Sequence, residues 1–238
     1  MKIPFYMEVI VGVLVVLVSY LIGNVNSAIL LSKMKGRDIR TCGSGNPGTM
    51  NMIRTFGKPM AAITLVLDVA KGVVPSVLGW LFMGTGQFCS LGNDRIGLYV
   101  AGLAVELGHI FPVVYKFKGG KGVATLFGVC LTFQPIAMIV SFSVGVVLLI
   151  FSQRGALTSF FMMSVPMTLE GIAAASSPMG YVSSLLIFAM FALTLFAHRS
   201  NLVTMFSGSE RRVVLKKSHR VKPLPDISIL VDEPVIVE

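Results

Sequence analysis

Two glycine-rich segments of this chain carry basic residues at short spacings. The first runs from Gly43 to Gly48 (Gly-Ser-Gly-Asn-Pro-Gly) and is followed by Asn51, Arg54 and Lys58. The second runs from Lys116 to Gly122 (Lys-Phe-Lys-Gly-Gly-Lys-Gly). Glycine lets backbone N–H groups approach a ligand closely, and lysine or arginine supplies positive charge. Both segments are typical of sites that bind a phosphate-containing ligand.

The first segment also offers side-chain donors. Ser44 has a hydroxyl, Asn46 and Asn51 have amides, and Arg54 can bind a phosphate through two parallel N–H groups. An ordinary turn between helices is also rich in such residues. We favour a functional site. The apolar stretches described below place this segment at a membrane interface, where crowded polar side chains are usually functional.

Neither segment fits a nucleotide site. Gly43–Gly48 matches the letters of the dinucleotide fingerprint, but no strand precedes it and no βαβ unit surrounds it. The second segment lacks the leading glycine of a P-loop at Tyr115 and has Gly122 where Ser or Thr is required. A generic phosphate site remains.

The elements that must position these segments are membrane spans. The chain has 238 residues, of which 54% are hydrophobic and 13% charged, against about 25% charged in soluble proteins. Because backbone in lipid must satisfy its own hydrogen bonds, we expect an all-α integral membrane protein with a retained first span. Candidate spans cover Met7–Leu31, Met60–Phe82, Ile96–Val114, Val123–Phe151, Leu157–Ala175 and Tyr181–Ala197.

The fourth stretch is too long for one span and contains Gln134-Pro135, which breaks a helix. We expect two shorter helices there, a partial or tilted hairpin, and about seven helices in all. That count places both glycine-rich segments, Arg154 and the basic C-terminal region on one face. A count of six spans would place Arg154 and the basic C-terminal region on the face opposite the two glycine-rich segments. The positive-inside rule makes this face cytoplasmic and the N-terminus external. We expect a membrane domain over 1–206 and a flexible basic tail over 207–238.

The net charge of +9 follows from the same rule, so no nucleic acid partner is expected. Charges inside the spans leave two interpretations open. Asp68 and Lys71 share a helix face, as a structural ion pair or as functional groups. Glu106 and His109 also share a face, as a general base with its orienting acid or, the reading we favour, as anchors of the second segment. Glu170 is isolated in its span and receives no role.

His198-Arg199-Ser200-Asn201 ends the last span on the same face as both segments. No acid follows either His109 or His198 at the spacing of the His/Asp acyltransferase pair. The chain also has no Gly-x-Ser-x-Gly elbow, and Cys42, Cys89 and Cys130 have no metal-site spacing. We therefore find no convincing catalytic pair and expect no metal.

The chain resembles the bacterial acyl-phosphate:glycerol-3-phosphate acyltransferases (PlsY) over about residues 5 to 212. The motifs that carry the resemblance are Gly43–Asn51 with Arg54 and Gly57-Lys58, Leu67–Gly72 with Pro75, Gly108–Pro112 with Phe117–Thr125, and His198-Arg199 with Asn201, Gly208 and Glu210. Their number and order make the resemblance specific.

The resemblance implies a seven-helix enzyme of the bacterial inner membrane with a cytoplasmic active site. It would transfer an acyl group from acyl-phosphate to the 1-hydroxyl of glycerol 3-phosphate, giving lysophosphatidic acid as the first step of phospholipid synthesis. The substrate phosphate would take the hydroxyl proton, so no protein base is required. No cofactor is expected either. The partners implied are both substrates, membrane lipid and an enzyme that produces acyl-phosphate.

The resemblance also assigns residues. The glycerol phosphate would be bound by Ser44, Arg54, Lys121, His198 and Asn201. The backbone of Gly119 and Gly120 would hold the acyl-phosphate head with Lys121, which also acts as electrostatic stabiliser. The expected substrate-binding set further includes Asn46, Asn51, Lys118 and Ser159.

Two departures from the family pattern affect this assignment. Thr49-Met50 stands where the family has Ala-Thr, so a hydroxyl is shifted or lost. The family has Arg-x-x-Ser after the hairpin, whereas here Ser159 is the nearest match to Arg154, with a slip of one or two residues.

Two other classes of protein remain possible from the residues alone. A transporter of a phosphorylated solute would use the same phosphate sites but requires repeats and helices broken at mid-membrane. The chain shows one clear break. A non-catalytic membrane subunit would not need two phosphate sites.

Overall fold

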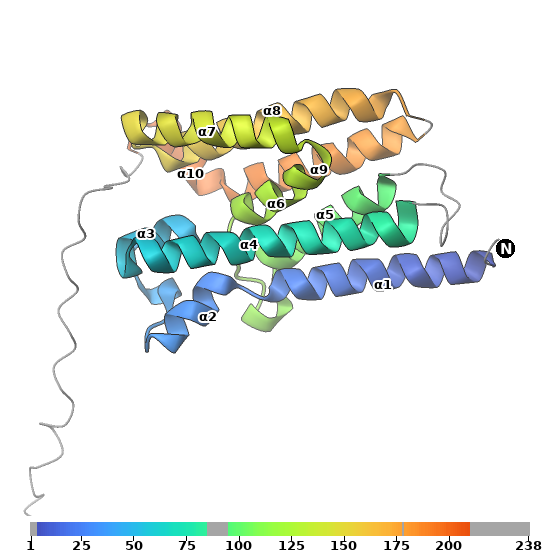
Figure 1. Ribbon diagram of the computed structural model, residues 1–238. Coiled ribbons are helices and arrows are strands. Elements are labelled where there is room, and N and C mark those ends of the chain that lie inside the picture. Colours follow the sequence, from blue (N-terminus) through green and yellow to red (C-terminus); the bar gives the residue numbers. More distant parts are fainter. Residues whose placement is uncertain (1–3, 85–94, 178, 210–238) are drawn as a thin grey trace, which may run out of the picture.

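The computed structural model describes residues 4–84, 95–177 and 179–209, and all its regular elements there are helices (Figure 1). The α-helices are α1 (Phe5–Asn24), α2 (Ser27–Met34), α3 (Thr49–Phe56), α4 (Lys58–Gly79), α5 (Ile96–Ile110), α6 (Val123–Phe133), α7 (Pro135–Ser152), α8 (Gly155–Ala175), α9 (Gly180–Ala197) and α10 (Arg199–Phe206). Short turns add η1 (Ile39–Thr41), η2 (Trp80–Gly84) and η3 (Val113–Tyr115). Two parts of the sequence interpretation lie outside the described residues. They are positions 210–238 of the predicted tail, which include Glu210, and Cys89.

The all-α membrane architecture is confirmed. Six helical stretches of the described chain are long and apolar enough to cross a membrane, and Val123–Phe133 is a shorter apolar helix. The long helices α1, α4, α7, α8 and α9 lie roughly parallel, and the N-terminus lies at the end of the bundle opposite α2, α3 and α10 (Figure 1). Large apolar side chains on their outer faces are exposed, as lipid contact requires.

The predicted break at Gln134-Pro135 is also confirmed. Gln134 has φ −134° and ψ 62°, outside helical values, and Pro135 begins α7. α6 has 11 residues, a length of about 16 Å, which is half of the roughly 30 Å apolar core of a bilayer. The pair is therefore a short helix followed by a long one, as the sequence predicts.

The first predicted span, Met7–Leu31, is interrupted in the structure. α1 ends at Asn24, Val25 is extended, and α2 begins after Asn26. The Asn26 side chain accepts a hydrogen bond from the backbone N–H of Ile29 at 3.0 Å, a regular N-cap. A run of small polar residues thus stops one helix and starts the next.

α5 is the central helix and is buried along most of its length. Its C-terminal half touches α1 closely: a Cβ on Gly108 would lie 2.1 Å from the carbonyl oxygen of Tyr20, and one on Gly23 2.2 Å from that of Val105. Small residues let these backbones approach each other. The end of α5, which leads into the second glycine-rich segment, is therefore fixed against the end of α1.

Glu170, which the sequence shows as isolated in its own span, has hydrogen-bond partners from other elements. Its carboxylate accepts hydrogen bonds from Arg95 at 2.8 and 3.1 Å, from Gln134 at 2.9 Å and from the Tyr99 hydroxyl. These partners are distant in sequence, so no spacing rule reveals them. The cluster joins α8 and the start of α5 to the turn of the α6–α7 hairpin.

Candidate active site

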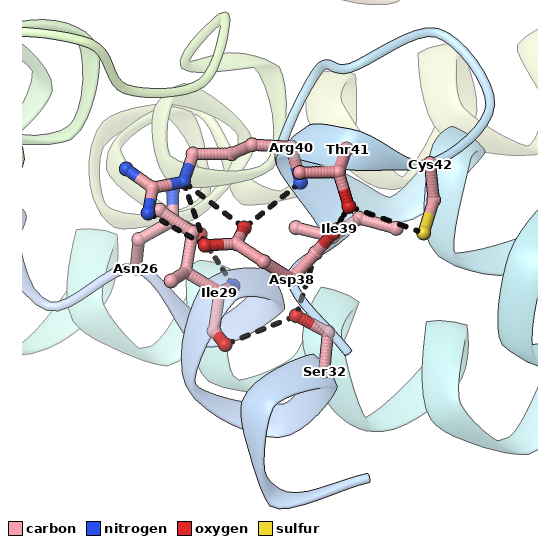
Figure 2. A network of polar contacts seen from close by, with 8 residues as sticks. All are labelled: Asn26, Ile29, Ser32, Asp38, Ile39, Arg40, Thr41 and Cys42. Atoms are coloured by element: carbon pink, nitrogen blue, oxygen red, sulfur yellow. Dashed lines mark hydrogen bonds and ion pairs between the residues drawn. The ribbon is translucent and has the colours of Figure 1, made fainter. Parts of the chain in front are cut away.

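The first glycine-rich segment follows a rigid lead-in (Figure 2). Ser32 at the end of α2 donates to the carbonyl of Ile29 and accepts from the N–H of Ile39, both at 3.0 Å. Arg40 lies against the Asp38 carboxylate at 2.6 Å. The hydrogen bond from Arg40 lowers the pKa of Asp38 to about 2, which burial partly opposes. Arg40 also stacks over the ring of Tyr115, 5.4 Å from its centroid. The residues that precede the first segment therefore contact the residue that precedes the second.

Asn51 organises the segment from inside. Its side-chain oxygen accepts from the backbone N–H of Ser44 at 3.1 Å, and its amide donates to the carbonyls of Ile39 at 3.2 Å and Cys42 at 2.9 Å. Asn51 is buried, whereas Ser44 is exposed. Through these hydrogen bonds Asn51 shapes the segment that presents Ser44.

α3 begins directly after this segment, at Thr49. The first backbone N–H groups of a helix have no intrahelical partner, which favours an anion there. The Thr49 hydroxyl oxygen is buried and has no hydrogen-bond partner among the described residues. Arg54 lies in the last turn of the same helix. The departure at Thr49 thus places an extra donor at the helix start.

The second segment folds back over the end of α5. The N–H of Gly119 donates to the carbonyl of Ile110 at 3.2 Å, and that of Gly120 to the carbonyl of His109 at 3.1 Å. A Cβ on Gly119 would lie 2.0 Å from the His109 oxygen, and one on Gly120 2.2 Å from His109 Nε2. Close packing explains the glycines, and both N–H groups are bound to carbonyls at the end of α5.

Glu106 and His109 fit the role of anchors better than that of a catalytic pair. Glu106 accepts a hydrogen bond from the Thr194 hydroxyl on α9. Its Oε1 would lie 3.3 Å from a Cβ on Gly122, directly beside the second segment. The His109 ring packs under Gly120 in the same way. Both side chains pack against the second glycine-rich segment from the α5 side.

Lys121, between these glycines, reaches the C-terminal element. Its Nζ donates to the side-chain oxygen of Asn201 on α10 at 2.5 Å. His198 stands where α9 ends and α10 begins. Its ring lies 5.2 Å from that of Phe160 on α8, next to Ser159. The hydroxyl of Ser159 donates to the carbonyl of Gly155 in its own helix.

The protonation of His198 follows from its contacts. Nδ1 lies 3.0 Å from the carbonyl oxygen of Thr194, which can only accept, so Nδ1 carries a proton. Burial lowers the pKa of His198 to about 4; the Thr194 bond opposes this shift, and the charge of Lys121 adds to it. The ring is neutral at pH 7, and Nε2 is a hydrogen-bond acceptor.

This shift predicts a pH dependence of stability. The folded pKa of about 4 lies below the ordinary value near 6.5, so unfolded protein binds the proton more tightly. The contribution of His198 is fully present above about pH 6.5 and is lost as the pH falls toward 4. We expect His198→Gln to lower the apparent Tm more at pH 7.5 than at pH 5. Thermal unfolding of both proteins in detergent checks this, and parallel pH curves would contradict it.

Three sequence-distant segments therefore meet. The first contacts the second where Pro47 and Gly120 approach, since a Cβ on Gly120 would lie 3.1 Å from the Pro47 oxygen. The second contacts the C-terminal element through Lys121 and Asn201. Lys118 is exposed beside them, and Asn46 and Arg54 are partly buried.

Sequence reasoning missed three supporting residues. Asn26 donates to the Pro47 carbonyl at 3.4 Å, Thr194 joins Glu106 to His198, and Phe160 packs on the His198 ring. Asn26 lies among polar residues that interrupt an apolar span, and this interruption is a signal in the sequence that could have identified it. Thr194 and Phe160 are ordinary residues of apolar helices and gave none.

The fold and the site define an integral membrane protein with phosphate-binding residue types gathered at one end of its bundle. Residues 13–208 match the family model described as Glycerol-3-phosphate acyltransferase, and the chain belongs to this family. It is 35% identical over 203 residues to a glycerol-3-phosphate acyltransferase of Thermoanaerobacter pseudethanolicus, covering 85% of this chain and 96% of the relative. A relative from Paraburkholderia phymatum is 36% identical over 208 residues, covering 87% and 94%.

Solved structures agree. The chain is similar to PlsY, an integral membrane glycerol 3-phosphate acyltransferase, crystallised in a glycerol 3-phosphate form with a TM-score of 0.73 and 31% identity. A form with lysophosphatidic acid gives 0.71 and 30%. Each match covers 84% of this chain and 94% of the other. The chain is accordingly an acyltransferase of phospholipid biosynthesis.

Proposed function

We propose that the protein transfers an acyl group from acyl-phosphate to the 1-hydroxyl of glycerol 3-phosphate, releasing lysophosphatidic acid and inorganic phosphate. The observation that supports this most is the bond between Lys121 and Asn201. It joins the second segment to the C-terminal element, while Gly120 packs against the first segment. Residues suited to two phosphate groups therefore surround one place.

The two substrates would use different parts of this site. Glycerol 3-phosphate is bound by Ser44, Arg54, Lys121, His198 and Asn201, with Asn46 and the start of α3 nearby. The acyl-phosphate head is held by Lys121 and Lys118, with Ser159 at the edge. Gly119 and Gly120 shape this region instead of donating their N–H groups, because those already bind carbonyls of α5.

The reaction needs no protein base. The glycerol oxygen forms a bond to the acyl carbon, the bond from that carbon to the phosphate oxygen breaks, and the departing phosphate takes the hydroxyl proton. Lys121 stabilises the negative charge that develops. Neutral His198 offers only an acceptor at Nε2, so it suits a glycerol hydroxyl better than a phosphate oxygen.

The basic residues at this end favour placement of the site at the cytoplasmic face of a bacterial inner membrane, with the N-terminus outside. An acyl-phosphate is a mixed anhydride, which activates its acyl group, and it is also an amphiphile. It would be supplied at the same face by an enzyme that makes acyl-phosphates.

The donor is tested directly with purified protein and labelled glycerol 3-phosphate. Acyl-phosphate is compared with acyl-CoA at saturating concentrations. We expect labelled lysophosphatidate from acyl-phosphate alone. Product formed equally well from acyl-CoA would contradict the donor assignment, and no product from either would contradict the proposed reaction.

Arg54→Lys tests the glycerol phosphate site. Lysine keeps the charge but cannot form two parallel hydrogen bonds to one phosphate. One charged hydrogen bond is worth about 1.5–3 kcal/mol, so KM for glycerol 3-phosphate should rise about 10- to 100-fold. Steady-state kinetics with each substrate varied measure this. An unchanged KM would remove Arg54 from the site.

A further inference from the structure

A buried ion pair on α4 contacts the break between α1 and α2. Lys71 Nζ lies 2.8 Å from Asp68 Oδ1, and both side chains are at most 7% exposed. This confirms the predicted ion pair. Each partner also makes a second hydrogen bond. Lys71 donates to the carbonyl of Val25 at 2.8 Å, and Asp68 accepts from the Ser27 hydroxyl at 2.8 Å. The pair therefore binds the break at two points.

The same break contacts the first glycine-rich segment and the residues that lead into the second. The Asn26 amide donates to the carbonyl of Pro47 in the first segment at 3.4 Å. The Asn24 side-chain oxygen accepts from the N–H of Val114, in the lead-in of the second segment, at 3.5 Å. Asn24 and Asn26 flank Val25, the residue that Lys71 binds. A shift of the break would thus be passed to both segments.

We propose that Lys71, held by Asp68, is a positioning residue for acyl transfer: it fixes the break between α1 and α2, and thereby sets the two glycine-rich segments relative to each other. The inference rests on the proposed assignment of these segments to the two phosphate-bearing substrates. The ammonium group donates to a carbonyl at the helix break, and the carboxylate holds the ammonium group in that position. Neither group touches substrate.

If the pair served stability alone, it would be equivalent to a second ion pair with a buried carboxylate among the described residues. That pair joins Arg95 to Glu170, which is fully buried, at 2.8 Å. It lies at the start of α5, whereas both segments lie at the end of that helix. Arg95→Gln is therefore the matched control, because it breaks an ion pair in the same bundle without contact with the break.

The experiment compares wild type, Lys71→Met and Arg95→Gln, with kcat normalised to the monodisperse folded fraction. Misplacing reactants by about 1 Å can cost about 10²-fold in rate. We expect Lys71→Met to lower kcat about 10- to 100-fold with much smaller changes in both KM values, and Arg95→Gln to lower Tm with kcat near wild type. Wild-type activity with acyl-phosphate is measured first, so failure of the proposed function is seen separately.

Two milder variants keep the inference testable if Lys71→Met does not fold. Ser27→Ala removes one bond to Asp68, and Asn26→Ser keeps an N-cap but loses the amide that reaches Pro47. Both should lower kcat several-fold in the same pattern. Wild-type kcat in every variant that folds would overturn the proposal. A rise in KM for glycerol 3-phosphate alone would also overturn it, because Lys71 would then be a substrate ligand.

Discussion

We expect Lys121→Met to lower kcat/KM for acyl transfer by about 10²–10³-fold, equivalent to about 2.7–4 kcal/mol of transition-state stabilisation. The substitution keeps the length of the side chain and removes its charge. The lost ammonium group is the one that joins the second segment to Asn201. Steady-state kinetics with purified protein measure the effect.

The control is Lys35→Met, which removes an exposed lysine at the end of α2 and should leave kcat/KM within a few-fold of wild type. A double-mutant cycle with Asn201→Ala tests the contact itself. Because the two side chains share one bond, the double variant should lose less than the sum of the single losses. Additive losses would contradict a shared role, and an unchanged kcat/KM in Lys121→Met would remove Lys121 from the site.

Gly119→Ala should lower kcat by at least about 10²-fold, because a methyl group there displaces the second segment. The new Cβ would lie 2.0 Å from the carbonyl oxygen of His109, 2.6 Å from Cδ of Pro112 and 2.8 Å from the carbonyl oxygen of Ile110. None of these atoms belongs to a flexible side chain. The segment must therefore move, and Lys121 moves with it. Single-turnover rates at saturating substrates measure the loss.

Gly171→Ala is the matched control. Gly171 lies inside α8, and a Cβ there would meet nothing within 4 Å. Alanine is preferred over glycine in a helix by about 0.5–1 kcal/mol, so this variant should be at least as stable as wild type and fully active. If Gly119→Ala kept wild-type kcat, the close packing against α5 would have no role in catalysis.

The sequence alone determined the features that depend on local composition. Long apolar stretches specify membrane helices wherever they pack, and Pro135 breaks a helix whatever surrounds it. The density of Gly, Ser, Asn and Arg at the first segment indicated a phosphate site, and the motif order carried the family resemblance. Each inference needs only local composition or the order of motifs along the chain.

The tertiary structure decided which groups face a ligand and which are used internally. Asn51 and the N–H groups of Gly119 and Gly120 resemble substrate donors in the sequence, yet all bind the protein's own backbone. Glu170 looks isolated but has partners from α5 and the hairpin turn, and Lys71 reaches a carbonyl 46 residues away. Hydrogen-bonding groups are satisfied by whatever the fold brings near, so only the packed chain shows which ones remain for a substrate.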